Sequence, residues 1–259
     1  MQGSPTEDQG EKEDIMKRKL EGITIPLKKE VEAKETTTYL ECVHLIHNAL
    51  PEVNFEEIDT STTFLNHRFS APLLIDAMTG GTPKGGTINA ILGAAAEEKG
   101  LGMVVGSQRA GLKAEDLAET YSVARENAPT AFIAANIGAP QLAKGFSVDE
   151  AKKLIEMIKA DALVIHLNPL QELIQPEGEP RYAGVLKGIK EITSKIGVPV
   201  IVKEVGCGIS KEVAIKLELA GVSAINIAGA GGTSWAGIEQ YRAEGMDAEE
   251  KVRLGRLFW

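Results

Sequence analysis

The sequence predicts one α/β domain of the TIM (β/α)8-barrel class, with about six βα units in the chain. From residue 71 onward, short apolar runs rich in β-forming residues alternate with helical segments, which is the pattern of repeated βα units. The chain has 259 residues, of which 43% are hydrophobic and 25% charged, enough for one large globular core. No long proline-rich or serine-rich linker interrupts the pattern. We therefore expect a single folded domain over residues 17–259.

The start of the chain differs from the rest in composition. Residues 1–14 are acidic and polar with almost no apolar side chains, so they cannot offset the entropy of ordering. We expect a disordered N-terminal extension over residues 1–16. The charged run Lys17, Arg18 and Lys19 is typical of a solvated patch, although a small phosphate ligand would also need local cations of this kind. Residues 38–48 are mixed and predict either a short helix or an irregular cover.

The regular part of the chain divides into alternating strands and helices. We predict strands at residues 72–77, 102–105, 131–135, 161–167, 198–202 and 224–228. Helices are predicted at residues 87–98, 115–126, 148–159, 183–195, 211–219 and 235–244. Gly100, Gly197 and Gly221 fall just past helix ends, where a left-handed cap favours a residue without Cβ.

All six predicted strands end in polar or glycine-rich residues. Each end alone could be a turn, but the loops that follow parallel barrel strands converge on one rim. Together they predict a single large ligand site at this rim. The residues concerned are Met78, Thr79, Gly80 and Gly81; Gly106, Ser107, Gln108 and Arg109; Asn136; His166 and Asn168; Lys203 and Glu204; and Gly231, Gly232 and Thr233.

The fourth predicted strand leads into the most chemically capable stretch. His166 could act as an acid, a base or a donor to phosphate, or it could be structural. Glu172, beside Gln171, offers the hard oxygen that Mg²⁺ takes when substrate phosphates and waters fill its other positions. The alternative is a capping turn, in which Asn168 and Pro169 open a turn and Glu172 lies in a first helical turn.

Two other strand ends suggest contacts to an anionic ligand. Gly231, Gly232 and Thr233 would let backbone N–H groups approach a phosphate closely, but a plain tight turn is the alternative. No G-x-G-x-x-G motif follows the first strand, so a Rossmann dinucleotide site is disfavoured. Lys203 emerges from an apolar strand, and either Glu204 or a ligand must compensate its buried charge.

Charge and composition exclude several classes of function. The net charge of −9 disfavours nucleic acid as a partner, because phosphate backbones bind basic surfaces. The longest apolar runs are only as long as strands and the first residues are acidic, so we expect no membrane span, no secretory signal and a cytoplasmic location. Cys42 and Cys207 have no paired spacing, which argues against a disulfide framework. We expect both cysteines to be buried.

These motifs together resemble the type 2 isopentenyl-diphosphate isomerase family, whose members are FMN-dependent enzymes of isoprenoid biosynthesis. The resemblance extends over most of the foldable chain, from Arg18 to Trp235. It rests on Arg18-Lys19, Met78-Thr79-Gly80-Gly81, Gly106-Ser107-Gln108-Arg109, Ala135-Asn136, His166-Leu167-Asn168-Pro169 with Gln171-Glu172, Gln175-Pro176-Glu177-Gly178, Val202-Lys203-Glu204 and Gly231-Gly232-Thr233.

The resemblance also implies site residues, with His166 and Gln171 in the catalytic roles. It implies FMN contacts for Met78, Thr79, Gly80, Ser107, Asn136, Lys203 and Thr233. It implies substrate diphosphate contacts for Arg18, Lys19, Ser107, Gln108, Arg109, His166, Asn168 and Gln171, and a Mg²⁺ contact for Glu172.

Family members interconvert isopentenyl and dimethylallyl diphosphate, need the flavin reduced, usually by NADPH, and assemble as homo-tetramers or octamers. This sequence departs from the family at Ala228, where relatives often carry serine. The family also continues past the position of Trp259 through two more βα units, with loops for the FMN phosphate. We therefore expect an apparently truncated barrel domain that alone binds FMN weakly and has no detectable activity.

Two alternatives to the isomerase remain. One is an FMN-dependent hydroxy-acid oxidase or dehydrogenase, which has a similar barrel with a lysine at the same strand end. Such oxidases need a late His/Arg pair, and this chain has no histidine after His166. The other is a non-catalytic truncated fragment or assembly partner. A flavin titration separates this last class from the enzymes.

Overall fold

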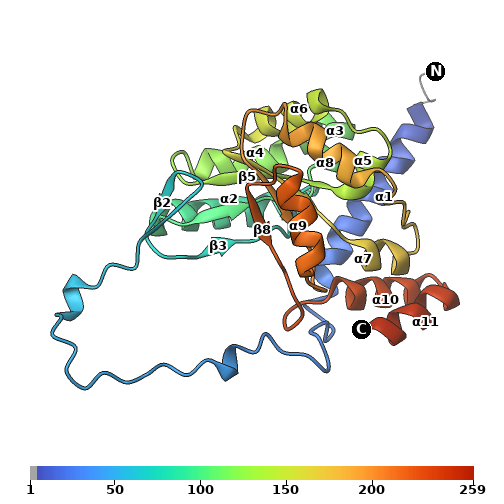
Figure 1. The fold of residues 1–259 in the computed structure, drawn as a ribbon. Helices are drawn as coiled ribbons and strands as arrows, with labels where there is room; N and C mark the ends of the chain where they lie inside the picture. Colours follow the sequence, from blue (N-terminus) through green and yellow to red (C-terminus); the bar gives the residue numbers. More distant parts are fainter. Residues whose placement is uncertain (1–4) are drawn as a thin grey trace.

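A computed structural model describes residues 5–259 and is built around one parallel sheet (Figure 1). Its six strands lie side by side in chain order, so each βα unit packs next to the one before it. This arrangement confirms the predicted α/β fold and all six predicted strands. The strands are β3 (Leu74–Ile75), β4 (Gly102–Val104), β5 (Ile133–Gly138), β6 (Ala162–His166), β7 (Val200–Lys203) and β8 (Ala224–Asn226).

The six predicted helices are also present, and their caps explain where they begin and end. Thr82, Ser147, Ser210 and Ser234 each accept a backbone N–H at a helix start, which satisfies one of the otherwise unpaired amides there. The glycines predicted at helix ends have φ angles of 62°, 80° and 85°. These helices are α2 (Pro83–Lys99), α4 (Glu119–Asn127), α6 (Val148–Ile158), α8 (Val185–Thr193), α9 (Lys211–Leu219) and α10 (Trp235–Gly245).

Several short elements were not predicted. The hairpin of β1 (Thr62–Phe64) and β2 (His67–Phe69) turns at Leu65 and Asn66, which both have positive φ. Two-residue hairpin turns usually carry Asn-Gly, and this turn has Leu65-Asn66 instead, so the sequence did not indicate a hairpin. The other unpredicted elements are α3 (Arg109–Lys113), α5 (Ala139–Ala143), α7 (Pro169–Ile174), α11 (Glu249–Phe258) and the 3₁₀ helix η2 (Phe55–Glu57). The 3₁₀ helix η1 (Leu40–Cys42) lies where a short helix or an irregular cover was predicted, and η3 (Glu115–Leu117) lies within the helix predicted at residues 115–126.

The N-terminal extension differs from the expectation. Helix α1 (Pro5–Thr24) covers most of the segment for which we expected disorder, whereas residues 1–4 lie outside the described part of the chain. Helix-forming Glu, Lys and Gln residues dominate this segment. Ile15 is buried with Ala110 and Leu117, so α1 has a tertiary contact that composition does not reveal.

The sheet is apolar on both faces, as expected for parallel strands covered on both sides. Alternate residues of β6 show this division. Leu163 and Ile165 belong to the larger core beneath the helices, whereas Ala162 and Val164 pack in a smaller core on the other face. That smaller core includes Phe69 from the hairpin, so the unpredicted hairpin covers this face of the sheet.

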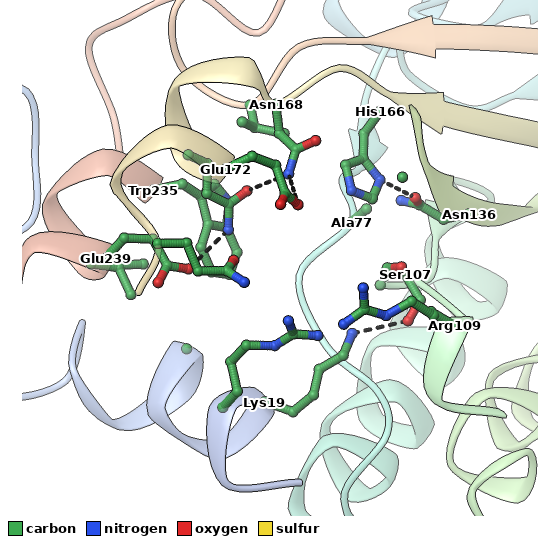
Figure 2. Close-up of a pocket in the computed structure, with 18 of the residues that line it drawn as sticks. Lys19, Ala77, Ser107, Arg109, Asn136, His166, Asn168, Glu172, Trp235 and Glu239 are labelled. Atoms are coloured by element: carbon green, nitrogen blue, oxygen red, sulfur yellow. Dashed lines mark hydrogen bonds between the residues drawn. The ribbon is translucent and has the colours of Figure 1, made fainter. Parts of the chain in front are cut away.

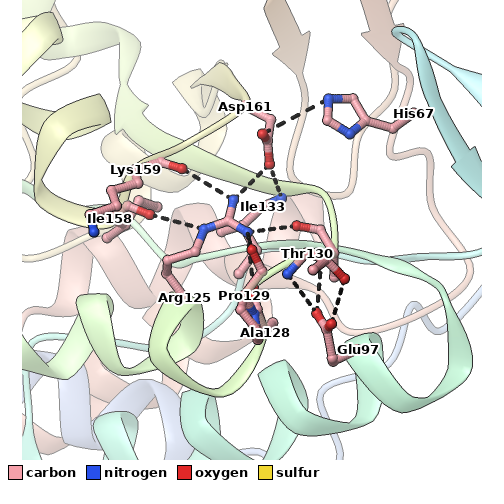
Figure 3. A network of polar contacts seen from close by, with 11 residues as sticks. His67, Glu97, Arg125, Ala128, Pro129, Thr130, Ile133, Ile158, Lys159 and Asp161 are labelled. Carbon is pink, nitrogen blue, oxygen red and sulfur yellow. Dashed lines mark hydrogen bonds and ion pairs between the residues drawn. The ribbon is translucent and has the colours of Figure 1, made fainter.

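A polar network joins the segments at the amino ends of β5 and β6 (Figure 3). The Arg125 guanidinium donates to the carbonyls of Ala128 and Ala131, at 2.8 Å each, and to the Asp161 carboxylate at 2.7 Å. Asp161 in turn accepts from the backbone N–H of Ile133 at 2.8 Å. These contacts satisfy the loop carbonyls opposite the rim where ligands bind, so we assign this network a structural role.

The two edge strands and one long segment are more exposed than the rest. Strands β3 and β8 are only half-buried, whereas β4, β5 and β7 are buried throughout. Residues 34–60 are all exposed and loop away from the domain (Figure 1). This long segment contains no helix apart from η1 and η2. No helix among residues 5–259 is long and apolar enough to cross a membrane.

Both cysteines are exposed, so the expectation that they are buried is wrong. Cys42 lies in the exposed 34–60 segment. Cys207 lies in the loop after β7, whose backbone N–H groups turn inward toward the Glu204 carboxylate. Both cysteines are exposed because they lie in surface segments, and composition alone does not indicate which segments lie at the surface.

Candidate functional site

A pocket opens at the carboxyl ends of the parallel strands, where the sequence predicted a ligand site (Figure 2). Strands β3 to β7 each contribute residues from their carboxyl end, and α1, α7 and α10 close the remaining sides. Figure 2 shows Lys19 and Arg109 below the cavity and His166, Asn168 and Glu172 above it. The contact residues implied by the resemblance that line this pocket are Arg18, Lys19, Met78, Ser107, Arg109, Asn136, His166, Asn168, Gln171, Glu172 and Lys203.

Four of the contact residues that the resemblance implies, Thr79, Gly80, Gln108 and Thr233, do not line this pocket. Gln108 is fully buried, and its amide bonds to Leu154 O and Asn136 N, at 3.0 and 2.9 Å, so it fixes the position of β5. The Thr79 hydroxyl lies 2.6 Å from the Asn89 amide oxygen. Gly80 packs so closely on Tyr121 that an added Cβ would lie 2.1 Å from the ring.

Thr233 lies outside the pocket because its loop is covered by another segment. Thr233 pairs with Glu32 in an isolated β-bridge, and the Gly232 carbonyl accepts from Ala33 N at 3.1 Å. An added Cβ on Gly231 would lie 2.3 Å from the Thr38 backbone nitrogen. The glycines therefore allow a close approach of the chain to itself in this structure.

Three cations converge on one side of the pocket. Arg18 and Lys19 come from α1, and Arg109 begins α3. Burial, together with the charges of Arg18 and Arg109, lowers the pKa of Lys19 to about 7. Burial and the Arg109 charge also lower the pKa of Arg18. None of the three forms an ion pair with a carboxylate of residues 5–259, so an anionic ligand would relieve their mutual repulsion.

Lys19 is also oriented by the backbone. Its ammonium donates to Ser107 O at 2.9 Å (Figure 2). This bond links α1 to the loop after β4, which carries Arg109. The arrangement holds the ammonium beside the pocket while leaving donors free for a ligand, because an ammonium has three.

His166 is held as a neutral imidazole. Its Nδ1 lies 2.7 Å from the Asn136 amide oxygen, which can only accept, so Nδ1 carries the proton and Nε2 is an acceptor. Burial, followed by the charges of Lys203, Lys19 and Arg109, lowers the pKa of His166 to about 3. A bound anion would oppose this effect and favour the imidazolium, which can donate to phosphate.

A chain of hydrogen bonds fixes the polar side chains of α7. The Asn168 amide donates to the side-chain oxygens of Gln171 and Glu172 at 3.1 Å each. Gln171 then donates to the Glu239 carboxylate at 3.1 Å. The second Glu172 oxygen accepts from Glu179 N at 2.9 Å. Glu172 therefore lies in a first helical turn, as one alternative held, and also faces the pocket.

Lys203 is buried, and the carboxylate that pairs with it is Asp76 rather than Glu204. The ammonium lies 3.4 Å from the Asp76 carboxylate and donates to the backbone carbonyl of Glu204 at 2.8 Å. The Glu204 carboxylate instead accepts from three backbone N–H groups, those of residues 205–207, at 2.5 to 2.8 Å. Asn226 donates to Asp76 at 3.0 Å, which orients the carboxylate toward Lys203.

Helix α10 contributes pocket residues that sequence reasoning missed. Trp235, Ile238, Glu239 and Arg242 line the pocket, and their spacing places them on one helix face. That spacing could have indicated a buried face, although not which element it would meet. Burial raises the pKa of Glu239, so a carboxyl group with proton affinity above its ordinary value lies beside Gln171.

Comparisons with known proteins show which proteins this chain is similar to. No protein-family model matches the chain. The isopentenyl-diphosphate delta-isomerase of Methanosarcina barkeri is 52% identical over 243 residues, which cover 94% of this chain and 66% of that protein. The protein of the same name from Archaeoglobus fulgidus is 49% identical, over 94% of this chain and 69% of that protein. The chain thus spans about two thirds of the length of these relatives.

A solved structure supports the fold alone. Mandelate oxidase crystallised with (S)-4-hydroxymandelic acid superposes with a TM-score of 0.50 at 14% identity, covering 91% of this chain and 76% of that one. At this identity the similarity carries no information on substrate.

Proposed function

The chain belongs to the isopentenyl-diphosphate delta-isomerase family, and from this premise we propose that it interconverts isopentenyl and dimethylallyl diphosphate with reduced FMN and Mg²⁺. The observation that carries the proposal is the group of three cations, Arg18, Lys19 and Arg109, which line the same pocket as Glu172. A diphosphate needs cations in this number, and a single carboxylate suits a metal ion shared with the substrate.

The substrate diphosphate would lie between α1 and the loop after β4. Its charge would restore the ordinary protonation of Lys19, whose pKa of about 7 reflects burial among like charges. Guanidinium groups at Arg18 and Arg109 can each make two parallel bonds to phosphate oxygens. These contacts bind the non-reacting end of the substrate and so orient the alkene.

Mg²⁺ would have one protein ligand in this proposal. Each Glu172 oxygen accepts one hydrogen bond, Oε1 from the Asn168 amide and Oε2 from Glu179 N. These two bonds fix the carboxylate and leave lone pairs available for a metal ion. Residues 5–259 contain no cluster of three or more potential metal-ligating side chains. Substrate oxygens and waters would therefore supply the rest of the coordination, which is usual for Mg²⁺.

The residues at the strand ends fit the ring of a flavin. Met78 and the neighbouring Ala77 offer apolar contact, Asn136 offers an amide, and Lys203 lines the same pocket with its ammonium. Thr79, Gly80 and Thr233 would reach the cofactor only if their loops moved, because other segments cover them here. Reduced FMN, with NADPH as reductant, would supply the proton exchange that shifts the double bond.

The chain's own polar residues would position the substrate. Moving this double bond adds a proton at one carbon and removes one from another, with no carbonyl to assist. Gln171, held between Asn168 and Glu239, would orient the alkene, and Trp235 with Ile238 would exclude water from it. His166 would donate to the diphosphate once an anion favours its protonated form.

We further propose a cytoplasmic homo-oligomer.

The direct test is isomerisation by a chimera that joins this chain to the part of the Methanosarcina barkeri protein outside the matched region. With Mg²⁺ and reduced FMN, isopentenyl diphosphate should convert to dimethylallyl diphosphate, which acid hydrolysis detects selectively. The rigorously oxidised flavin should give no conversion. Equal turnover with oxidised flavin would contradict the mechanism.

A further inference from the structure

Arg242 is buried at the centre of an ion cluster that the proposed reaction does not use. Its side chain is 5% exposed and donates to three carboxylates. The distances are 2.7 Å to Glu21, 2.7 Å to Glu177 and 2.6 Å to Glu239. These carboxylates come from three separate parts of the chain: α1, the loop after α7, and α10 itself.

Each of these carboxylates is linked to a residue of the proposed site, Glu239 by a hydrogen bond and the other two through the neighbouring chain. Glu21 lies on α1 one turn after Arg18, so its position determines where the two α1 cations lie. Glu177 lies two residues before Glu179, whose backbone N–H holds the Glu172 carboxylate. Glu239 accepts the hydrogen bond of Gln171. The Arg242 guanidinium therefore lies where the diphosphate, metal and alkene parts of the site meet.

Helix α1 has few other contacts near its cations. Its buried apolar residue, Ile15, lies one turn before Arg18, and Gly22 approaches the Trp235 ring so closely that an added Cβ would lie 3.3 Å away. Arg18, Lys19 and Arg109 carry like charges in one pocket wall, so their mutual repulsion disfavours this position of α1 when no anion is bound. An anchor beyond Lys19 is needed to oppose it, and the Glu21–Arg242 pair supplies one.

The cluster also attracts Arg18 without pairing with it. Three carboxylates surround the single charge of Arg242, and the charges of Glu177 and Glu239 favour the charged form of Arg18. Arg18 makes no ion pair with residues 5–259, so its guanidinium remains available to a ligand. The cluster attracts the helix that carries this cation while the donors of Arg18 face the pocket.

We propose that Arg242 is a positioning residue, which holds α1 and the Glu172 loop so that their side chains meet on one diphosphate. The inference rests on the proposed function, because it assigns Arg242 a role in assembling that site. Arg242 acts through its ion pairs with Glu21 and Glu177, so each ion pair can be removed separately. Substitution by glutamine keeps the shape of each side chain and removes its charge.

The first experiment measures inorganic pyrophosphate binding to the 259-residue chain by calorimetry. Glu21→Gln should raise the Kd roughly tenfold, with or without Mg²⁺, because the α1 cations lose their anchor. Backbone amide exchange in α1 should accelerate in the same variant. Glu13→Gln is the matched control, since Glu13 is exposed on the same helix, and it should change neither measurement.

The second variant separates a positioning role from a merely structural one. Glu177→Gln should not weaken Mg²⁺-free pyrophosphate binding, because α1 keeps its pair with Arg242, but it should reduce the gain in affinity that Mg²⁺ gives, because the Glu172 loop loses its tie. A structural role would make both glutamine variants weaken binding alike. Arg242→Lys should raise the Kd less than Glu21→Gln does and should reduce the gain with Mg²⁺ less than Glu177→Gln does. Lysine keeps the positive charge, but its ammonium cannot form the three-way fork of the guanidinium.

The outcomes separate this inference from the proposed function. If the wild-type chain binds pyrophosphate and Glu21→Gln neither weakens binding nor speeds α1 exchange, the positioning role is overturned while the anion site stands. Identical losses in both glutamine variants, with or without Mg²⁺, also overturn it. No pyrophosphate binding by the wild type would overturn the proposed diphosphate site itself, and with it this role for Arg242.

Discussion

Replacing Lys19 by Arg should remove a pH dependence from diphosphate binding while keeping the affinity. Burial and two neighbouring guanidinium groups lower the pKa of Lys19 to about 7. A bound diphosphate would raise this pKa again, so binding above pH 7 must take up a proton. Arginine stays charged throughout this range, so Lys19→Arg binds without that uptake.

The magnitude follows from the fraction of charged Lys19. An amine with a pKa of about 7 is charged in about nine of ten molecules at pH 6 and in about one of ten at pH 8. The Kd of pyrophosphate for the wild type should therefore rise roughly tenfold over this range, beyond any change caused by the ligand's own titration. Lys19→Arg reports the contributions of the ligand and of His166, because both proteins share them.

Calorimetric titrations at pH 6, 7 and 8 measure the difference between the two proteins. The ratio of wild-type to variant Kd should increase with pH. A constant ratio would mean that Lys19 is charged throughout and that the three cations do not crowd one another in solution. A variant that loses binding at every pH would show that the ammonium geometry at Ser107, rather than its charge, determines binding.

Three further predictions address the metal, acid stability and the cofactor. Glu172→Gln should sharply weaken the apparent affinity for Mg²⁺ in calorimetry with pyrophosphate and leave FMN binding nearly unchanged; a normal Mg²⁺ dependence would make Glu172 only a helix-start residue. The pKa of His166 is about 3 in the folded chain and about 6.5 unfolded, so the unfolded state binds more protons between these values and stability falls as pH drops through this window. Urea unfolding at pH 7 and pH 4 should show a smaller loss for His166→Asn than for the wild type, and equal losses would refute the assignment. The chimera with two further βα units should bind FMN at least ~100-fold more tightly than this chain, because two or three charge-assisted hydrogen bonds contribute roughly 1.5 to 3 kcal/mol each; equal affinity by flavin fluorescence would contradict this.

The sequence predicted the sheet and the rim because these depend on local pattern. Apolar runs followed by polar residues located β6 and its site residues, and the convergence rule for parallel strands brought Asn136, His166 and Lys203 together. Helix ends could be predicted equally well, since Gly100 has the left-handed conformation that its position after a helix indicated. These predictions use information within one or two turns of each residue.

The partners across the pocket could not be predicted from local pattern. Arg242 meets Glu21 across 221 positions of sequence, and Lys203 meets Asp76 from a strand that is not its neighbour. A periodic helix face shows that α10 buries one side, but not that α1 lies against it. The glycine-rich turn at residues 231–233 suggested a phosphate contact, but in the structure Gly231 packs against Thr38 of the exposed 34–60 segment.

The most direct test of the diphosphate pocket is a calorimetric titration of isopentenyl diphosphate into the 259-residue chain, with and without Mg²⁺. We expect one saturable site per chain, bound more tightly with Mg²⁺. The double variant Arg18→Ala with Lys19→Ala should fold normally but bind far more weakly, because these side chains act on the ligand and α1 carries little of the core. Equal binding by the wild type and the double variant, or no effect of Mg²⁺, would contradict the account.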